Sequence, residues 1–185
     1  MNGNLLSTLW PRSQAAAVNK VLLVAAGVVL LVISAKVQVP FWPVPMTLQT
    51  LAVLMIGATY GARLAASTLA AYLAAGAVGL PVFATGAGLA YMAGPTGGYL
   101  AGFFIAACLL GWLADRGLGR TLLSALLLFV IGEVVIFGLG ASWLAMLIGG
   151  EKALAAGVMP FIPGEILKMA LATAILSVAW KRARG

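Results

Sequence analysis

Two ionisable side chains in an otherwise apolar segment offer the clearest chemistry in this sequence. Glu165 and Lys168 follow the prolines of MPFIPGEILK (159–168) and are three residues apart. On an α-helix this spacing places both side chains on one face, so an anionic acceptor and a cationic donor lie side by side. Such a pair suits the binding of a small polar molecule. A structural ion pair, or two side chains that reach to the membrane interface, is the competing interpretation.

A third ionisable residue, Glu133, lies in the middle of a long apolar run. A lone carboxylate at membrane depth is costly, so it must face the interior of a helix bundle. The Glu133 carboxylate could be stabilised in three ways: by protonation, by a hydrogen bond to a neighbour, or by pairing with Lys168. The sequence leaves a structural and a functional role for Glu133 equally open.

Two loops rich in glycine, proline and aromatic residues offer further binding groups. Three prolines within 37–46 cannot continue a helix. The segment 81–98 ends in glycines that allow close backbone approach, and free amides at a helix start attract anions. A tight turn that caps a helix explains these glycines as well, and an interfacial belt explains most of the aromatic residues. The aromatic residues at the expected outer ends are Phe41, Trp42, Phe83, Tyr91, Tyr99 and Phe161.

The residues needed for several kinds of functional site are missing from the sequence. The chain has no histidine, one cysteine and four acidic residues, which excludes a dense metal site or a Cys–His pair. There is no phosphate-binding loop ending in Gly-Lys-Ser/Thr, and Gly86-Ala87-Gly88 lacks the spacing of a dinucleotide fingerprint. We therefore expect no metal, no cofactor and no catalytic residues. Any pumping must be driven by a partner or an ion gradient.

The elements that must position these residues are membrane-spanning helices. The chain is 63% hydrophobic and 8% charged, with a mean hydropathy of +1.12, whereas soluble domains have about 25% charged residues. We predict an all-α, polytopic membrane protein with a single domain over residues 1–185. Six transmembrane helices of roughly 20 residues fit this length. They are expected at about residues 14–36, 47–60, 64–80, 99–113, 121–147 and 163–180.

The positive residues predict the orientation. Cytoplasmic loops of membrane proteins collect lysine and arginine, and an N-terminus in the cytoplasm leaves only Lys36 and Lys152 outside, with Lys168 inside the last helix. Both termini are therefore expected in the cytoplasm, and Glu165 near the outer surface. Because the positive residues separate hydrophobic segments, they do not indicate nucleic-acid binding. Those expected inside are Arg12, Lys20, Arg63, Arg116, Arg120, Lys181, Arg182 and Arg184.

Three stretches of the sequence together carry a resemblance to a known family. They are VPFWPVPMTLQTLAVLMIGATYG (39–61), GLPVFATGAGLAYMAGPTGGYLAGF (79–103) and GVMPFIPGEILKMALA (157–172). In order and spacing they resemble the BioY family, the biotin-specific substrate-binding (S) components of energy-coupling factor (ECF) transporters. The resemblance is weakest at 1–20 and 115–156. It implies a multi-pass S component of the cell membrane that binds biotin for uptake, energised by a membrane T component and two ATPase subunits.

The resemblance also implies roles for particular residues. Family members carry an acid, more often aspartate, and a lysine that match Glu165 and Lys168. We expect Glu165 to accept a hydrogen bond from a ureido N–H of biotin, and Lys168 to meet its carbonyl or carboxylate. The residues expected to complete the site are Phe41, Trp42, Phe83, Thr85, Tyr91, Gly97, Gly98 and Tyr99.

Three other functions compete with this interpretation. The first is an S component for a different small vitamin. The second is an intramembrane enzyme that uses Glu133 or Glu165 as acid or base, although no second catalytic carboxylate, metal ligand or nucleophile lies on a matching face. The third is a structural membrane scaffold, in which replacement of Glu165 and Lys168 would be tolerated.

Overall fold

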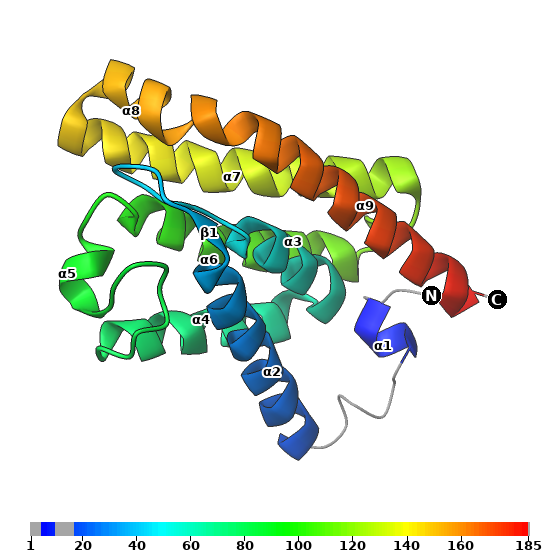
Figure 1. Cartoon of the computed structure of the whole chain (residues 1–185). Helices are drawn as coiled ribbons and strands as arrows, with labels where there is room; N and C mark the ends of the chain where they lie inside the picture. Colours follow the sequence, from blue (N-terminus) through cyan, green and yellow to red (C-terminus); the bar gives the residue numbers. More distant parts are fainter. Residues whose placement is uncertain (1–4, 10–16, 185) are drawn as a thin grey trace.

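The computed structural model describes residues 5–9 and 17–184, and this part of the chain is almost entirely helical (Figure 1). The longer helices are α2 (Ala17–Lys36), α3 (Gln49–Tyr60), α4 (Ala62–Ala77), α6 (Gly97–Asp115), α7 (Leu122–Ile148) and α9 (Ile162–Arg184). Short helices lie between them: α1 (Leu5–Leu9), α5 (Gly88–Met92), α8 (Gly150–Gly157) and a 3₁₀ turn, η2 (Met159–Phe161). Strands β1 (Gln38–Val39) and β2 (Met46–Thr47) pair antiparallel, with Gln38 opposite Thr47.

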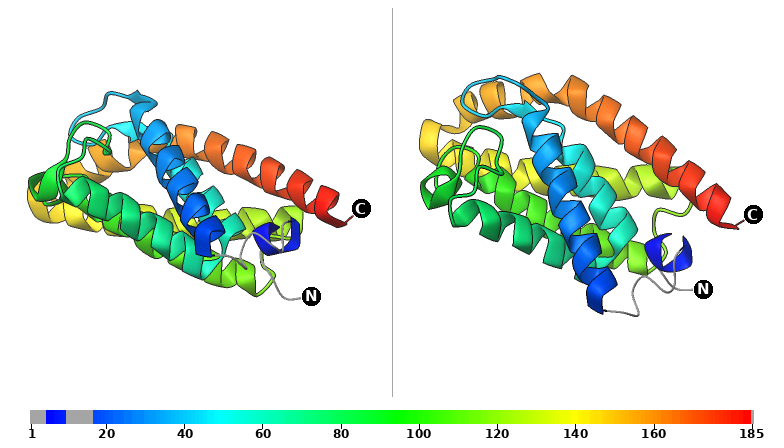
Figure 2. Two further views of the ribbon diagram at one scale, coloured as in Figure 1. Left: turned by 90° about the horizontal axis from the view of Figure 1, so that it is seen from below. Right: turned by 60° about the horizontal axis from the view of Figure 1, so that its bottom comes forward.

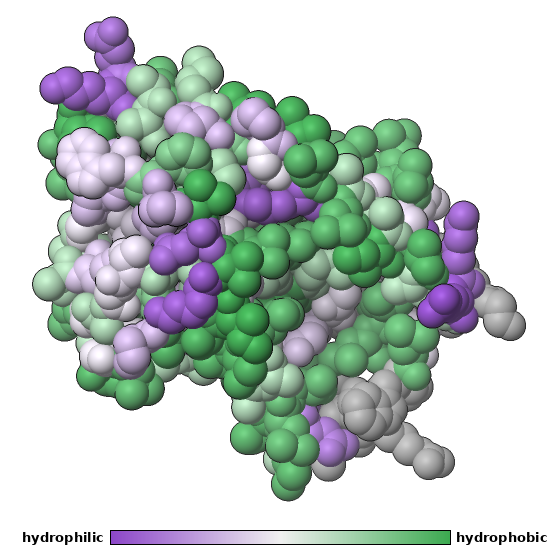
Figure 3. Space-filling model, in the orientation of Figure 1, coloured by the Kyte–Doolittle hydropathy of each residue, from purple (hydrophilic) through white to green (hydrophobic). Residues whose placement is uncertain are grey.

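Four helical segments of the described chain are long and apolar enough to cross a membrane. They are Ala17–Lys36, Gly97–Asp115, Leu122–Ile148 and the nearly continuous run Gly150–Ala183. Large apolar side chains such as Leu22, Leu123, Val134 and Leu167 are more than half exposed. Hydrophobic residues make up much of the surface seen in Figure 3. A surface of this kind is favourable in contact with lipid and not with water. The prediction of a helical, multi-pass membrane protein is confirmed; the count of six spans stays a prediction.

Most helix boundaries differ from the predicted ones by a few residues. Residues 14–16 of the first predicted helix lie outside the described residues. Helix α4 ends at Ala77 instead of residue 80, because Gly79 has a left-handed backbone (φ +98°) and Leu80 donates its amide to the Ala75 carbonyl at 3.1 Å. This is the usual glycine-ended termination of a helix. Helix α9 runs on to Arg184 instead of ending at residue 180.

Helices α6 and α7 form the centre of the bundle, and α3 and α4 pack on α6. Glycine permits the closest of these approaches: a Cβ atom on Gly102 of α6 would lie 2.9 Å from the Ile136 Cα of α7. A Cβ atom on Gly111 would lie 2.6 Å from the Ala62 amide nitrogen. Small residues let membrane helices pack backbone to backbone in this way. The bundle thus has a rigid centre against which the site is built.

Irregular segments gather at one end of the bundle. The β1–β2 hairpin, α5 and α8 lie together there, while α1 and the last turns of α9 lie at the other end (Figures 1 and 2). Two hydrogen bonds tie the hairpin region to the α4–α6 connection. The Lys36 Nζ donates to the Phe83 carbonyl at 2.6 Å, and the Gln38 Nε2 donates to the Ala84 carbonyl at 3.5 Å.

Candidate ligand-binding site

Glu165 and Lys168 face the interior of the protein, at the start of α9. The Lys168 Nζ lies 2.7 Å from the Glu165 Oε1, and Glu165 is only 5% exposed. The first turn of α9 places the carboxylate at the positive end of the helix dipole, a favourable position for an acidic residue. The pair therefore does not point into lipid.

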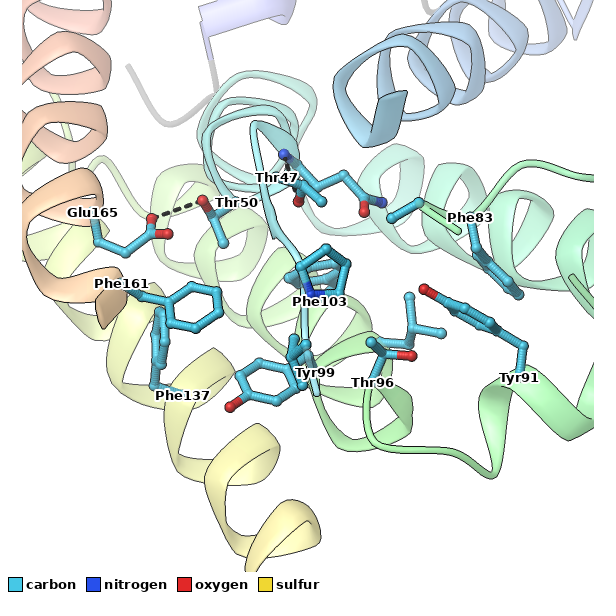
Figure 4. A pocket seen from close by; sticks show the side chains of 15 residues that line it. Thr47, Thr50, Phe83, Tyr91, Thr96, Tyr99, Phe103, Phe137, Phe161 and Glu165 are labelled. Carbon is cyan, nitrogen blue, oxygen red and sulfur yellow. Dashed lines mark hydrogen bonds between the residues drawn. The ribbon is translucent and has the colours of Figure 1, made fainter. Parts of the chain in front are cut away.

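A threonine from α3 joins the pair into one network. The Thr50 Oγ1 donates to the Glu165 Oε2 at 2.7 Å (Figure 4). The Lys168 Nζ donates to the Thr50 Oγ1 at 3.0 Å and to the Thr47 carbonyl at 2.6 Å. With Glu165, these contacts occupy all three donors of the ammonium group. Lys168 is thereby fixed in place, and one free acceptor position remains on each Glu165 oxygen.

This network borders a cavity that contains about 480 Å³ of space between atoms, part of it open to the outside. Its walls come from the hairpin, α3, the α4–α6 connection, α6, α7, η2 and α9, and most of them are apolar (Figure 4). The lining residues are Val44, Pro45, Thr47, Gln49, Thr50, Phe83, Ala84, Tyr91, Thr96, Tyr99, Leu100, Phe103, Phe137, Phe161 and Glu165.

Aromatic rings form the walls away from the charged network. Phe83 and Tyr91 stack with ring centroids 5.2 Å apart. Phe137 and Phe161 meet edge to face at 5.9 Å. Tyr99 lines the cavity with its ring, while its hydroxyl donates to the Gly157 carbonyl at 2.8 Å. The cavity therefore combines one polar corner with flat apolar faces, which suits a ligand that has a polar head and an apolar body.

A buried amide supports the cavity wall next to the network. Gln49 is 3% exposed, and its Nε2 donates to the Tyr72 hydroxyl at 2.7 Å. The Tyr72 hydroxyl in turn donates to the Val82 carbonyl at 3.1 Å. This chain of bonds links the start of α3 to α4 and to the loop that carries Phe83.

The structure brings some of the predicted site residues together and not others. Glu165, Phe83, Tyr91 and Tyr99 line the cavity, and Lys168 stands behind Glu165 and Thr50. Phe41 lies outside, with its ring 6.0 Å from that of Phe161. Thr47, Thr50 and Gln49 were missed by the sequence analysis. The signal available for them was a group of polar residues, MTLQT (46–50), between a proline-rich loop and an apolar helix.

Besides Phe41, four predicted residues do not reach the cavity wall. Trp42 is 85% exposed, and Thr85 is exposed with its Oγ1 3.4 Å from the Tyr91 hydroxyl. Gly97 and Gly98 pack against other parts of the chain: a Cβ atom on Gly98 would collide with the Trp143 side chain. The Gly97 amide already donates to the Gly94 carbonyl at 3.0 Å. Both glycines therefore serve close packing, and a ligand contact through the Gly98 amide stays a prediction.

Glu133 lies on α7, close enough to Glu165 and Lys168 for their charges to act on it. It is 7% exposed. Neither of its carboxyl oxygens has a hydrogen-bond partner within the described part of the chain. It does not line the cavity, so a direct ligand contact is not its role in this geometry. Across the described residues, no three His, Cys, Asp or Glu side chains gather as metal ligands would.

Comparisons with known proteins agree on one family. A model of the BioY family matches residues 8–185. The chain is 40% identical over 157 residues to the "Probable biotin transporter BioY" of Pyrococcus horikoshii, covering 84% of this chain and 93% of that protein. It is 37% identical over 159 residues to the "Biotin transporter BioY" of Rhizobium etli, covering 81% and 85%. A solved structure, described as the S-component for biotin from an ECF-type ABC transporter, superposes with a TM-score of 0.78 at 25% identity, covering 89% of this chain and 92% of that one.

Proposed function

Because the chain belongs to the BioY family, we propose that it is a membrane subunit that binds biotin for uptake, and not an enzyme. The observation that carries this proposal is the buried Glu165–Lys168–Thr50 network at the wall of an aromatic cavity. Relatives named as biotin transporters and the biotin S-component neighbour supply the identity of the ligand.

The chemistry of biotin fits the two kinds of cavity wall. Its ureido ring has two N–H donors, its bicycle is apolar, and its tail ends in a carboxylate. A free acceptor position on Glu165 takes a ureido N–H, a charge-assisted hydrogen bond of the stronger kind. The rings of Phe83, Tyr91 and Phe161 cover the apolar body. A ligand without the ureido donors leaves Glu165 buried with an unfilled acceptor, which discriminates against simple fatty acids.

Lys168 contributes mainly by holding Glu165 in this arrangement. All three of its donors are used, by Glu165, Thr50 and the Thr47 carbonyl. Direct contact between Lys168 and a ligand carbonyl or carboxylate requires exchange of one of these partners. In place of the direct contact expected from the sequence, we propose that Lys168 chiefly holds the carboxylate in position.

The experiment that tests this function is titration of the purified, detergent-solubilised chain with biotin and with a panel of other vitamins. We expect saturable binding of biotin alone among them. Glu165→Gln and Lys168→Met should each abolish tight binding. Glu151→Gln and Lys152→Met, the same changes on an exposed pair in α8, should leave it intact. Tight binding of another vitamin, or unchanged affinity in both site variants, would refute the proposal.

We further propose six spans with both termini in the cytoplasm of a cell-membrane protein, and no cofactor. The distribution of lysine and arginine supports this orientation. The chain has one cysteine, Cys108, so single cysteines can be placed in a Cys108→Ser background. A cysteine at position 151 should react with an impermeant maleimide in intact cells, and one at position 182 only after lysis. The reverse pattern would refute the orientation.

A T component and two ATPase subunits are the proposed source of energy for uptake. The similarity to an S-component of an ECF-type transporter supports this. Because the sequence has no phosphate-binding loop, any ATP-driven uptake depends on ATPase partners. Co-expression of the chain with such subunits should yield a complex that co-purifies and accumulates biotin only with ATP. Equal accumulation without ATP would refute this partnership.

A further inference from the structure

Glu165 separates two hollows of the molecule. On one side is the aromatic cavity, and on the other is an apolar groove between α7 and α9. Phe137 and Glu165 line both, and Glu133 lines the groove only. Glu133 therefore stands behind Glu165 as seen from the cavity, on the side away from the proposed ligand.

The ionisable groups that act on Glu133 are Glu165 and Lys168, both on α9. Helix α7 also packs against α3, α6 and α8, and the largest electrostatic influences on Glu133 come from Glu165 and Lys168, not from the other titratable or charged groups on these helices and on α9. These other groups are Tyr60, Tyr99, Cys108, Asp115, Glu151, Lys152, Lys181 and Arg182.

The charges at this place do not balance if both acids are ionised. Lys168 is the cation that chiefly acts on Glu133 within the described residues, and it is already paired with Glu165 at 2.7 Å. A second carboxylate would leave one uncompensated negative charge, 93% buried, at membrane depth. Such a charge is strongly unfavourable, and the group takes up a proton instead. A protonated carboxyl becomes a hydrogen-bond donor.

We propose that Glu133 carries a proton in the binding-competent protein and donates it in a hydrogen bond to Glu165, so that it positions the ligand-binding carboxylate from behind. This inference rests on the proposed function. Each oxygen of Glu165 has one partner, Lys168 or Thr50, and therefore has an acceptor position left for such a bond. Glu133 is a positioning residue here, since it does not touch the cavity.

Ligand binding is then linked to the proton on Glu133. When the pH rises far enough to remove that proton, two carboxylates share one lysine and repel each other. Glu165 moves away from its binding position, so biotin affinity falls toward alkaline pH. A glutamine at position 133 remains a neutral donor at every pH and removes this part of the fall.

The test measures biotin affinity of the purified chain from acid to alkaline pH in four proteins: the natural chain, Glu133→Gln, Glu133→Leu and the exposed control Glu151→Gln. At neutral pH, Glu133→Gln should bind within about twofold of the natural chain, and Glu133→Leu about tenfold or more weakly, as expected for loss of a hydrogen bond to a charged group. The alkaline loss of affinity should be smaller in Glu133→Gln than in the natural chain and the control. The same alkaline loss in Glu133→Gln as in the natural chain, or unchanged affinity in Glu133→Leu, would overturn the proposal.

A second measurement does not need the ligand. Infrared spectra at neutral pH should show a protonated-carboxyl band that disappears in Glu133→Gln and persists in Glu151→Gln. If the band is absent from the natural chain, the proton assignment is wrong even where biotin binds normally. Failure of the natural chain to bind biotin while the band is present would instead count against the proposed function.

Discussion

The two ends of the cavity are built on opposite principles. At one end, Glu165, Lys168 and Thr50 are joined by hydrogen bonds of 2.7–3.0 Å between two helices. At the other, Phe83 and Tyr91 are carried by the connection between α4 and α6 and meet through stacked rings. Hydrogen bonds at fixed positions discriminate between ligands, whereas flat apolar rings tolerate differences in shape. Specificity should therefore reside at the helical end, and the loop end should contribute mostly contact area.

The largest effect is expected from breaking the charged pair on one side only. Lys168→Met leaves Glu165 buried without its cation and should destabilise the protein by about 3–5 kcal/mol. The double variant Glu165→Gln/Lys168→Met removes both charges and should recover most of this stability without recovering binding. Thermal unfolding in detergent measures the first effect and biotin titration the second. Equal unfolding temperatures for the single variant and the natural chain would show that the pair is not a buried unit.

The next effect concerns the hydroxyl that bridges the pair. Thr50→Val keeps the shape of the side chain but removes the hydrogen bond to Glu165, and biotin affinity should fall about tenfold to a hundredfold. Thr50→Ser retains the hydroxyl and serves as the matched control, with affinity close to that of the natural chain. If Thr50→Val binds as well as Thr50→Ser, the bridge does not orient the carboxylate.

A smaller effect is expected at the loop end. Tyr91→Leu removes the ring that stacks on Phe83, and stacked rings contribute about 0.5–1.5 kcal/mol, so affinity should fall roughly threefold to tenfold. Tyr91→Phe keeps the ring and should bind almost normally, because the hydroxyl has only a 3.4 Å contact with Thr85. Isothermal titration distinguishes the two. A larger loss in Tyr91→Phe than in Tyr91→Leu would show that this end also recognises polar groups.

The smallest effect is expected where the loops are tied together. Lys36→Met removes the hydrogen bond from Nζ to the Phe83 carbonyl and should speed biotin dissociation only a few-fold, since one partly exposed hydrogen bond contributes about 1 kcal/mol. Lys152→Met, an exposed lysine on α8, is the control. Stopped-flow dissociation measures both, and a Lys36→Met rate equal to that of the control would rule out a role for the tie.

The helical end was also the more predictable end. The spacing of Glu165 and Lys168 places them on one helix face whatever the rest of the fold does. Their partner Thr50 is 115 residues away from Glu165 in the chain, and no local pattern reveals such a contact. Gly97 and Gly98 show the reverse difficulty. Glycine at a helix start is equally compatible with ligand-facing amides and with close packing, and no local pattern reveals that Trp143 packs against Gly98.

The sequence also predicted that these helices exist, because apolar runs mark them. It did not predict where each helix begins and ends. Apolar runs predict where helices α2, α6, α7 and α9 lie. The short α3 and the end of α4 depend instead on Gly61 and Gly79, both with positive φ, and a glycine in an apolar run can equally continue a helix. How these shorter helices sit in the bilayer is therefore not settled by hydropathy, since 12 residues in α3 span only about 18 Å.

The ties from Lys36 and Gln38 to the loop carrying Phe83 and Ala84 join two loops that the sequence separates by more than 40 residues. An insertion in either segment would therefore displace the other through these hydrogen bonds. Changes far from Glu165 would then alter how fast a bound molecule is released, while the contacts at Glu165 that select the molecule stay the same.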